Sequence, residues 1–217
     1  MEANLVYRAV QLYRASAGEN GLPPLRISLE KHIPDGAGLG GGSADASFTL
    51  RALNALSSRP LTGSQLEALA AQLGADCPVF ISNRPAYAEG VGEKLMPTDI
   101  DLSGRWAVIV KPPFGIPTRE AFAGITPHGN RIDLRQAVLK PIEQWKDLIV
   151  NDFEASLFPR HPELPFIKET LYDCGAVYAS MSGSGSAMYG IFRGRNEAEQ
   201  AAADSRFRPF AVFTAML

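Results

Sequence analysis

A glycine-rich segment between a predicted strand and a predicted helix offers the clearest chemistry in this sequence. It reads Pro34-Asp35-Gly36-Ala37-Gly38-Leu39-Gly40-Gly41-Gly42-Ser43-Ala44. Glycines let consecutive backbone N–H groups converge on an anion without Cβ clashes. The N-terminus of the following helix adds unpaired N–H groups and the positive end of its dipole. The segment therefore predicts a phosphate-binding loop that needs no lysine. In it, Ser43 either caps the helix or donates its hydroxyl to a phosphate or a metal.

Two familiar phosphate loops fit this segment poorly. A Walker A loop ends in Gly-Lys-Ser/Thr, and the segment contains no lysine. A dinucleotide-binding loop opens a βαβ unit with an acidic residue about 20 positions on, whereas this sequence continues with two helices. The remaining alternative is a glycine-rich turn that serves only tight packing.

The carboxylate of Asp76 is the best candidate for acid–base work. It follows a predicted helix stop at Gly74 and precedes Pro78 and the apolar run 79–81, which we interpret as a buried strand. Such a carboxylate can orient an attacking hydroxyl and accept its proton. Because an ordinary aspartate has a pKa of about 3.9, its positioning matters more than its proton affinity. The alternative role is that of a turn or capping aspartate.

A second small-residue segment, Ser182-Gly183-Ser184-Gly185, joins the predicted strands 176–181 and 187–192. It is either a flexible hairpin turn or a second loop whose backbone packs beside a ligand or beside the first loop. The sequence alone leaves both alternatives open.

The remaining candidate metal ligands and thiols point to structural roles. His32, His128 and His161 show no metal-ligand spacing, so we expect them at the surface or in loops. Cys77 and Cys174 form no disulfide framework or zinc motif, and we expect both to be small core residues.

Composition limits the classes of function. The chain has 217 residues, 46% of them hydrophobic and 20% charged, enough for one large core or two small ones. With 21 basic and 23 acidic residues, it has no broad positive field for nucleic acid or an anionic membrane. No apolar run has the roughly 18–20 residues of a membrane span, and the first residues do not resemble a signal peptide. We expect a protein of the reducing cytoplasm.

Hydrophobic periodicity predicts a chain of the α+β class. The composition shifts between Gly90 and Gly104, which predicts one domain over 1–100 and another over 101–217. Helices are expected from an Asn4 cap to a Gly18 stop, from Ala46 to Leu56, and near 64–73, 117–123, 134–146, 153–157, 165–173 and 197–204. Strands are expected at 25–30, 79–81, 106–110, 176–181, 187–192 and 210–216.

Taken together and in this order, the motifs are much more specific than any one of them. The segment 34–46 resembles the second motif of the GHMP small-molecule kinases, and 181–185 resembles their third. The stretches 73–80, 88–93 and 151–154 are similar to one branch of that superfamily. That branch phosphorylates 4-diphosphocytidyl-2-C-methyl-D-erythritol in the methylerythritol phosphate route to isoprenoids. The resemblance covers essentially the whole chain.

The resemblance implies a two-domain GHMP kinase fold, with an ATP-binding N-terminal domain and a ferredoxin-like C-terminal α/β domain. It implies transfer of a phosphoryl group from ATP to the 2-hydroxyl of this small molecule, with Asp76 as the catalytic aspartate. Mg²⁺ would accompany ATP, with no assigned protein ligand. Asn4-Leu5-Val6 resembles a segment near the adenine pocket. The residues implied around the ATP phosphates are Pro34, Asp35, Gly36, Ala37, Gly38, Leu39, Gly40, Gly41, Gly42, Ser43 and Ala44, with Ser182, Gly183, Ser184 and Gly185 supporting that loop.

One part of the family pattern has no counterpart here. The family opens with a strand carrying Lys-x-Asn-Leu and then an Asp-Gly-Tyr-His segment, whereas the first lysine here is Lys31 and no histidine follows Gly-Tyr. We therefore expect an incomplete N-terminal domain in which the strand 25–30 lacks pairing partners and exposes an apolar edge. Two alternatives remain: a GHMP kinase with another acceptor, such as homoserine or a mevalonate intermediate, and a non-catalytic nucleotide-binding fragment or paralogue.

The absent lysine motif leads to a prediction about activity. This chain should bind nucleotide weakly and show little turnover, because the lysine that pairs with the catalytic aspartate has no counterpart. Calorimetric titration with ATP and an assay of ADP formation with the cytidylylated acceptor measure both properties. Full phosphorylation of that acceptor by the 217-residue chain would contradict the prediction.

Overall fold

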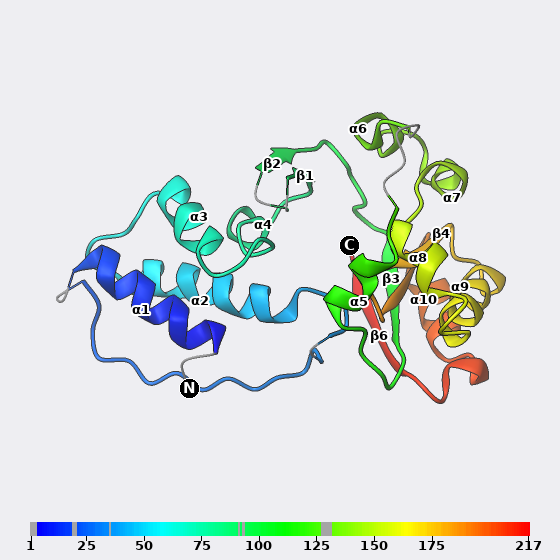
Figure 1. Ribbon diagram of the computed structural model, residues 1–217, viewed down its shortest axis with the longest axis horizontal. Helices are drawn as coiled ribbons and strands as arrows, with labels where there is room; N and C mark the ends of the chain where they lie inside the picture. Colours follow the sequence, from blue (N-terminus) through cyan, green and yellow to red (C-terminus); the bar gives the residue numbers. More distant parts are fainter. Residues whose placement is uncertain (1–3, 19–20, 35, 91, 93, 127–131) are drawn as a thin grey trace. The chain divides into compact units, whose positions relative to one another are not determined.

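The computed structural model describes residues 4–18, 21–34, 36–90, 92, 94–126 and 132–217 (Figure 1). The chain divides into two compact units. Unit 1 comprises Met1–His32 and Gly40–Asp99, and unit 2 comprises Ile33–Leu39 and Ile100–Leu217. Part of the glycine-rich segment therefore belongs to unit 2, although the helix that follows it belongs to unit 1.

Unit 1 is built mainly from helices. They are α1 (Leu5–Ala17), α2 (Gly41–Leu56), α3 (Gly63–Ala71) and α4 (Val79–Ser82). The Asn4 side chain accepts hydrogen bonds from two N–H groups at the start of α1, and Gly18 ends that helix at φ +80°, as the sequence predicts. Helix α3 begins with a capping box between Thr62 and Gln65. Figure 1 shows α1 lying alongside α2.

The core of unit 1 lies where these helices meet. Tyr13 and Leu50 are fully buried, and the Tyr13 hydroxyl donates to Asn54 Oδ1 at 2.7 Å. A buried phenol needs such a partner, because an unpaired one costs about 1–3 kcal/mol. The other buried apolar residues are Ala9, Ala17, Ala46, Leu53, Leu66, Leu69, Ala70, Leu73, Cys77 and Ile81.

The prediction of a strand at 79–81 is wrong, because these residues form the helical turn α4. Pro78 precedes it with φ −58°, a value that suits a helix start, and Asn83 ends it in the left-handed region at φ +50°. A short apolar run does not by itself distinguish a strand from a buried helix. A hairpin that the sequence analysis missed follows, with β1 (Ala86–Glu89) antiparallel to β2 (Lys94–Pro97).

The strand expected at 25–30 is also not formed, since no strand pairs with it among the described residues. The segment runs beside α1, where Leu25, Ile27 and Leu29 line a groove of about 650 Å³ together with Val6 and Val10 of that helix. Ile27 is 48% exposed and Leu29 is 44% exposed. Alternating apolar residues favour a strand, but a strand also needs a partner to satisfy its backbone. The expected exposure of apolar residues is therefore found, but the strand edge that was to carry them is not.

Unit 2 contains a four-stranded antiparallel sheet in the order β4-β5-β3-β6. Its strands are β3 (Trp106–Lys111), β4 (Tyr178–Met181), β5 (Met188–Phe192) and β6 (Ala211–Met216). Helix α9 (Glu163–Asp173) precedes β4, and α10 (Arg195–Ala202) joins β5 to β6. This βαββαβ order is the ferredoxin-like arrangement, so the expected α+β class is confirmed.

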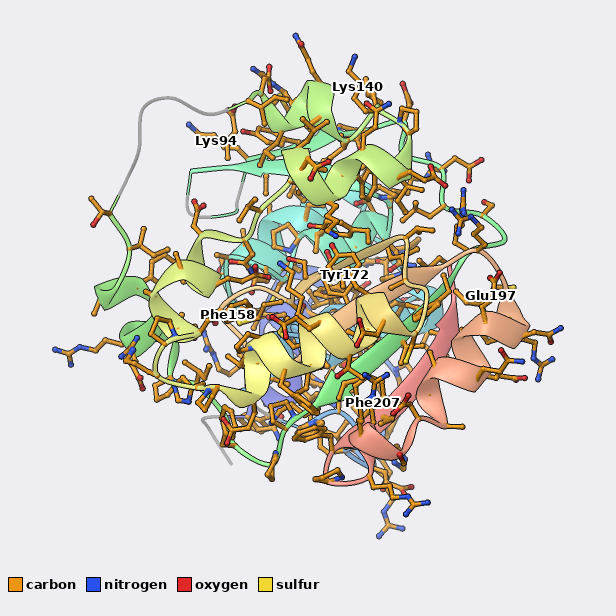
Figure 2. The ribbon with its side chains drawn as sticks, turned by 90° about the vertical axis from the view of Figure 1, so that its right-hand side faces the viewer. Lys94, Lys140, Phe158, Tyr172, Glu197 and Phe207 are labelled. Carbon is orange, nitrogen blue, oxygen red and sulfur yellow. The ribbon has the colours of Figure 1, made fainter. Side chains whose placement is uncertain are left out.

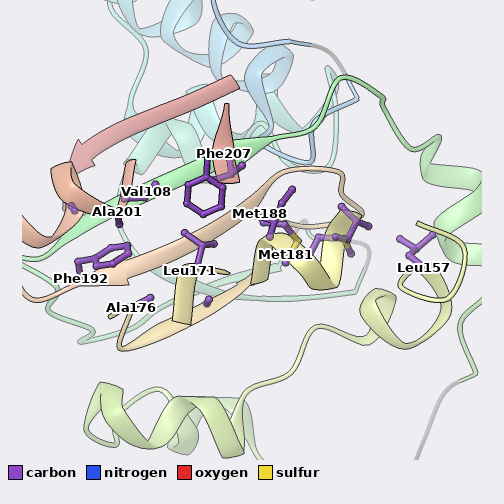
Figure 3. Packing of buried hydrophobic residues seen from close by; sticks show 14 of the residues in the cluster. Val108, Leu157, Leu171, Ala176, Met181, Met188, Phe192, Ala201 and Phe207 are labelled. Carbon is purple, nitrogen blue, oxygen red and sulfur yellow. The ribbon is translucent and has the colours of Figure 1, made fainter. Parts of the chain in front are cut away.

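The two faces of this sheet are covered differently. Helices α9 and α10 lie over one face (Figure 2), where Val108, Leu171 and Phe192 are buried together (Figure 3). On the other face, Tyr178 and Trp145 meet edge to face with ring centroids 5.6 Å apart. Neighbouring residues along β4 and β5 alternate between the buried groups on these two faces, as a pleated sheet requires.

The helical region between β3 and β4 differs from the prediction at one place. The helix expected over 134–146 is broken into α6 (Leu134–Ala137), a 3₁₀ turn η1 (Ile142–Gln144) and α7 (Trp145–Leu148). Pro141 has no N–H to donate and ends the helical register. The remaining elements are α5 (Thr118–Ala123), α8 (Asp152–Leu157) and η2 (Ser205–Phe207). Among the described helices, none has the length and apolar character that crossing a bilayer requires.

The exposed groove beside α1 predicts self-association. Replacing Ile27 and Leu29 together by serine should lower the weight-average mass in sedimentation at high concentration, because two exposed apolar side chains are removed from one patch. Leu56→Ser is a matched control, since Leu56 is 56% exposed in the same unit but does not line the groove. Equal effects of the two changes, or no effect of either, would contradict a specific role for the groove.

Candidate functional site

The glycine-rich segment passes from unit 2 to unit 1 at the Leu39–Gly40 peptide. Residues 36–39 are therefore described with the sheet of unit 2, and residues from Gly40 onward with the helices of unit 1. Asp35, one of the predicted phosphate-loop residues, lies outside the described residues.

In unit 2, the first half of the segment is hydrogen-bonded to the loop between β4 and β5. The Ser182 hydroxyl donates to the Gly38 carbonyl at 2.8 Å, and the Ala187 N–H donates to the Ala37 carbonyl at 2.9 Å. Ala37 is only 2% exposed. The structure therefore brings together two segments that the sequence singled out separately, and the 182–185 turn packs on the first loop.

The two loops approach so closely that glycine is required at the contact. Gly38 has φ +73°, and a Cβ there would overlap the carbonyl oxygen of Ser182. From the other side, a Cβ on Gly183 would lie 3.2 Å from the Gly38 oxygen. Only a residue without a side chain permits both the left-handed conformation and this separation.

A third loop, which follows β3, packs against the same segment. A Cβ on Gly115 would lie 3.2 Å from the Gly36 oxygen. The buried Lys111 ammonium holds this loop, donating to the carbonyls of Pro112 and Phe114 at 2.6 Å each. Burial lowers the pKa of Lys111. The hydroxyl of Ser186, just beyond the β4–β5 turn, also donates to the Phe114 carbonyl, at 2.5 Å.

In unit 1, the second half of the segment forms the N-terminus of α2. Gly40 is the N-cap residue at φ +64° and offers no side chain to cap the helix. The first N–H to donate within the helix is that of Ala44, to the Gly40 carbonyl at 2.8 Å. The N–H groups of Gly41, Gly42 and Ser43 come before it and point out of the helix end, where the dipole is positive. Such a terminus can bind an anion.

Ser43 lies within the first turn of α2 and not at its cap, so of its two predicted roles the contact with a phosphate or metal is the one that remains. The Ser43 hydroxyl lies close to the Cys77 thiol, as does that of Ser47. Burial raises the pKa of this thiol, and the two hydroxyls partly oppose that effect. Cys77 is the small core residue that the sequence predicts.

Asp76 lies in the turn just before α4, next to the start of α2. Ser47 Oγ of α2 donates to the Cys77 carbonyl at 2.7 Å, and the Phe80 ring lies beneath Gly40. The Asp76 side chain is exposed, and its Oδ1 would lie 3.7 Å from a Cβ built on Gly92. Within unit 1 the carboxylate therefore lies beside Gly92, while the next residue, Cys77, is hydrogen-bonded to α2.

Three polar residues near the loops of unit 2 were not given roles by the sequence analysis. Asn151 and Glu154 hydrogen-bond to the end of β4, and Lys111 holds the loop after β3. Two features of the sequence could have indicated these roles. One is a lysine at the end of an apolar strand, and the other is a glutamate between apolar residues of a short helix. A buried position could not be distinguished from an exposed one without the fold.

The other candidate ligands remain apart from these loops or take structural roles. His32 is exposed, His161 is half-buried and stacks on Phe114, and His128 lies outside the described residues. Cys174 is half-buried beside Asp204 and Arg206 and packs against the core of unit 2, so the prediction of a core residue holds only in part. Across the described part of the chain, no three His, Cys, Asp or Glu side chains are grouped to hold a metal.

Comparison with known families matches both parts of the chain. Residues 4–84 match the GHMP kinases N-terminal domain, and residues 134–206 match the GHMP kinases C-terminal domain. A 4-diphosphocytidyl-2-C-methyl-D-erythritol kinase from Bacteroides thetaiotaomicron is 50% identical over 191 residues, which are 88% of this chain and 69% of the relative. The same enzyme from Porphyromonas gingivalis is 46% identical over 209 residues, 95% of this chain and 75% of the relative.

Solved structures show the same similarity in three dimensions. A crystal structure of 4-(cytidine 5'-diphospho)-2C-methyl-D-erythritol kinase superposes with a TM-score of 0.82 at 36% identity, covering 97% of this chain and 76% of that one. Homoserine kinase from Cytophaga hutchinsonii superposes with a TM-score of 0.73 at 18% identity, covering 100% of this chain and 76% of that one. At that identity the likeness concerns the fold alone.

The close approach at Gly38 predicts a large stability effect. Gly38→Ala should lower the free energy of unfolding of unit 2 at least twice as much as Gly104→Ala. Both glycines have positive φ, +73° and +80°, but nothing lies within 4 Å of a Cβ at Gly104, which leaves only a strain of roughly 1–2 kcal/mol. Both tryptophans, Trp106 and Trp145, lie in unit 2, so fluorescence during urea unfolding reports on that unit. Equal losses for the two variants would contradict the contact.

Proposed function

Because this chain belongs to the GHMP kinase family, in the branch of the 4-diphosphocytidyl-2-C-methyl-D-erythritol kinases, we propose that its site serves the reaction named for that branch. In this reaction the γ-phosphoryl group of ATP is transferred to the 2-hydroxyl of the cytidylylated methylerythritol. The observation that carries the proposal is the 50% identity over 191 residues to the Bacteroides thetaiotaomicron enzyme. Homoserine kinase, with a different acceptor, is only 18% identical.

We assign the ATP phosphates to the residues 34–44. The supporting features are the glycines at positive φ, the free N–H groups at the start of α2 and the absence of a side chain at the Gly40 cap. Together these place partial positive charge and an open backbone along one short stretch, which suits a polyphosphate. The loop 182–185 packs on Ala37 and Gly38 and would keep the first half of this stretch in place.

We assign the acceptor hydroxyl to Asp76. The turn that carries it also carries Cys77, whose carbonyl accepts from Ser47 of α2, and α2 begins with the helix end that we assign to the phosphates. The hydroxyl oxygen forms a bond to the γ-phosphorus as the bond to the bridging oxygen of ADP breaks, and the hydroxyl proton passes to the carboxylate. In such a loose transition state the carboxylate acts mainly by orienting the nucleophile.

Mg²⁺ bound with ATP would offset the charge of its phosphates. The Ser43 hydroxyl, in the first turn of α2, and the Asp76 carboxylate are hard oxygen donors of the type that Mg²⁺ accepts. Cys77 and Cys174 are free thiols, which supports the reducing cytoplasm as the place of this reaction. We propose a small molecule as the only substrate besides ATP, with no nucleic acid or membrane partner.

A transfer assay with a panel of acceptors tests this function. With protein in excess over radiolabelled ATP, label should pass to the cytidylylated methylerythritol and not to homoserine or mevalonate. Single-turnover conditions detect transfer even when its rate is low. Transfer to homoserine or mevalonate, or no saturable ATP binding, would contradict the proposal.

The role of Asp76 has its own test. Asp76→Asn should lower the transfer rate by roughly 100-fold or more while changing ATP affinity less than threefold, because the amide orients the hydroxyl poorly and cannot take its proton. Asp99→Asn is the control, an exposed aspartate of the same unit with no place in the proposed site. An unchanged rate in Asp76→Asn removes the carboxylate from the mechanism.

A further inference from the structure

Asn151 uses its whole side chain to join a helix start to the end of β4. Its Oδ1 caps α8 by accepting from the Phe153 N–H at 3.0 Å. Its Nδ2 donates both hydrogens, to the carbonyls of Met181 and Gly183 at 2.8 Å each. An amide group has two donors and one acceptor oxygen, and here each has a partner.

Glu154, which lies in the same helix, holds the same peptide segment. It is 5% exposed, and its Oε1 accepts from the Met181 N–H at 2.8 Å and from the Ser180 hydroxyl at 3.1 Å. Its Oε2 pairs with Lys168 Nζ at 2.5 Å. A buried carboxylate is tolerated only with such partners. The N–H and the carbonyl of Met181 are thus fixed by two side chains of one short helix.

The fixed segment leads directly to the glycine-rich loop. Met181 ends β4, and the next residue, Ser182, donates its hydroxyl to the Gly38 carbonyl. The Ser182 N–H donates to the Ala187 carbonyl at 2.8 Å, and the Ala187 N–H in turn donates to Ala37. A continuous set of hydrogen bonds therefore runs from α8 to Ala37 and Gly38, all within unit 2.

We propose that Asn151 and Glu154 are positioning residues for the triphosphate of ATP: they fix the 182–187 loop, which fixes Ala37 and Gly38. The inference rests on the proposed function, since that function assigns residues 34–44 to the phosphates. Neither side chain contacts the phosphates in this role. A glycine-rich loop loses much conformational entropy when it orders around a ligand. A loop held in place beforehand therefore binds its anion more tightly.

Asn151→Asp separates the two functions of this side chain. The carboxylate still caps α8 toward the Phe153 N–H, but one oxygen replaces Nδ2, so that both donated hydrogens are lost and this oxygen faces two carbonyls. In calorimetry on the full chain, the variant should bind ATP about tenfold more weakly, which is a loss of about 1.4 kcal/mol of binding free energy. Adenosine, which lacks the phosphates, should bind within twofold of the wild-type value. Ser156→Ala is the control, because it removes one hydrogen bond of α8, to the Phe153 carbonyl, that does not reach the loop.

Glu154→Gln serves as the conservative variant. Its amide oxygen still accepts from Met181 and Ser180, so ATP affinity should stay within threefold of wild type even though the charge facing Lys168 is lost. Glu154→Ala removes that acceptor and should weaken ATP binding as Asn151→Asp does. Equal affinity of the Gln and Ala variants would overturn the positioning role of Glu154.

Amide hydrogen exchange distinguishes failure of this inference from failure of the proposed function. In Asn151→Asp, the amides of Gly185 and Ala187 should exchange faster, while those of β3 and β5 keep their wild-type rates. Wild-type protein that binds no ATP contradicts the proposed function, and with it the phosphate role. Wild-type ATP affinity with unchanged exchange in Asn151→Asp overturns the inference alone, as does an equal loss of ATP and adenosine binding.

Discussion

The contact between Gly38 and Ser182 constrains the surrounding part of unit 2. These residues are 144 positions apart, yet the hydroxyl of one donates to the carbonyl of the other at 2.8 Å. Neither of the two segments can carry a side chain at the closest point, so the pairing depends on Gly38 and Gly183. Because the approach leaves so little room, any shift of the β4–β5 loop must shift the glycine-rich segment as well. The sheet and its helices can therefore be regarded as the support for that segment.

The glycine-rich segment, our proposed phosphate site, combines two different backbone features. Its first half, at Ala37 and Gly38, is a backbone loop fixed by hydrogen bonds from the sheet of unit 2. Its second half, from Gly40, is the uncapped N-terminus of a 16-residue helix in unit 1. The first half supplies fixed geometry and the second supplies the helix dipole. Asp76 lies in the turn whose next residue, Cys77, is hydrogen-bonded to Ser47 of α2.

Local signals predicted the elements, and contacts distant in sequence supplied what the prediction lacked. Asn4 and Gly18 marked the ends of α1, and the sequence placed β3 to β6 closely, because caps and apolar periodicity are local properties. The segment 25–30 has the alternating pattern of a strand but does not form one, because a strand needs a partner to pair with. The resemblance implied that 182–185 supports the glycine-rich loop, but only the fold places Ser182 against Gly38. The fold also shows that Asn151 and Glu154 hydrogen-bond to the end of β4 and the turn after it, where their partners lie 26 to 32 residues away in sequence.

We propose that residues 36–43 bind the phosphates of a nucleotide. Titration of isotopically labelled protein with ATP, followed by backbone amide chemical shifts, is the sharpest test, because each of these residues reports through its own N–H. The largest shifts should fall on Gly36 to Ser43, and adenosine should not reproduce them. Large ATP-dependent shifts confined to other parts of the chain, with the amides of Gly36 to Ser43 unmoved, would contradict it.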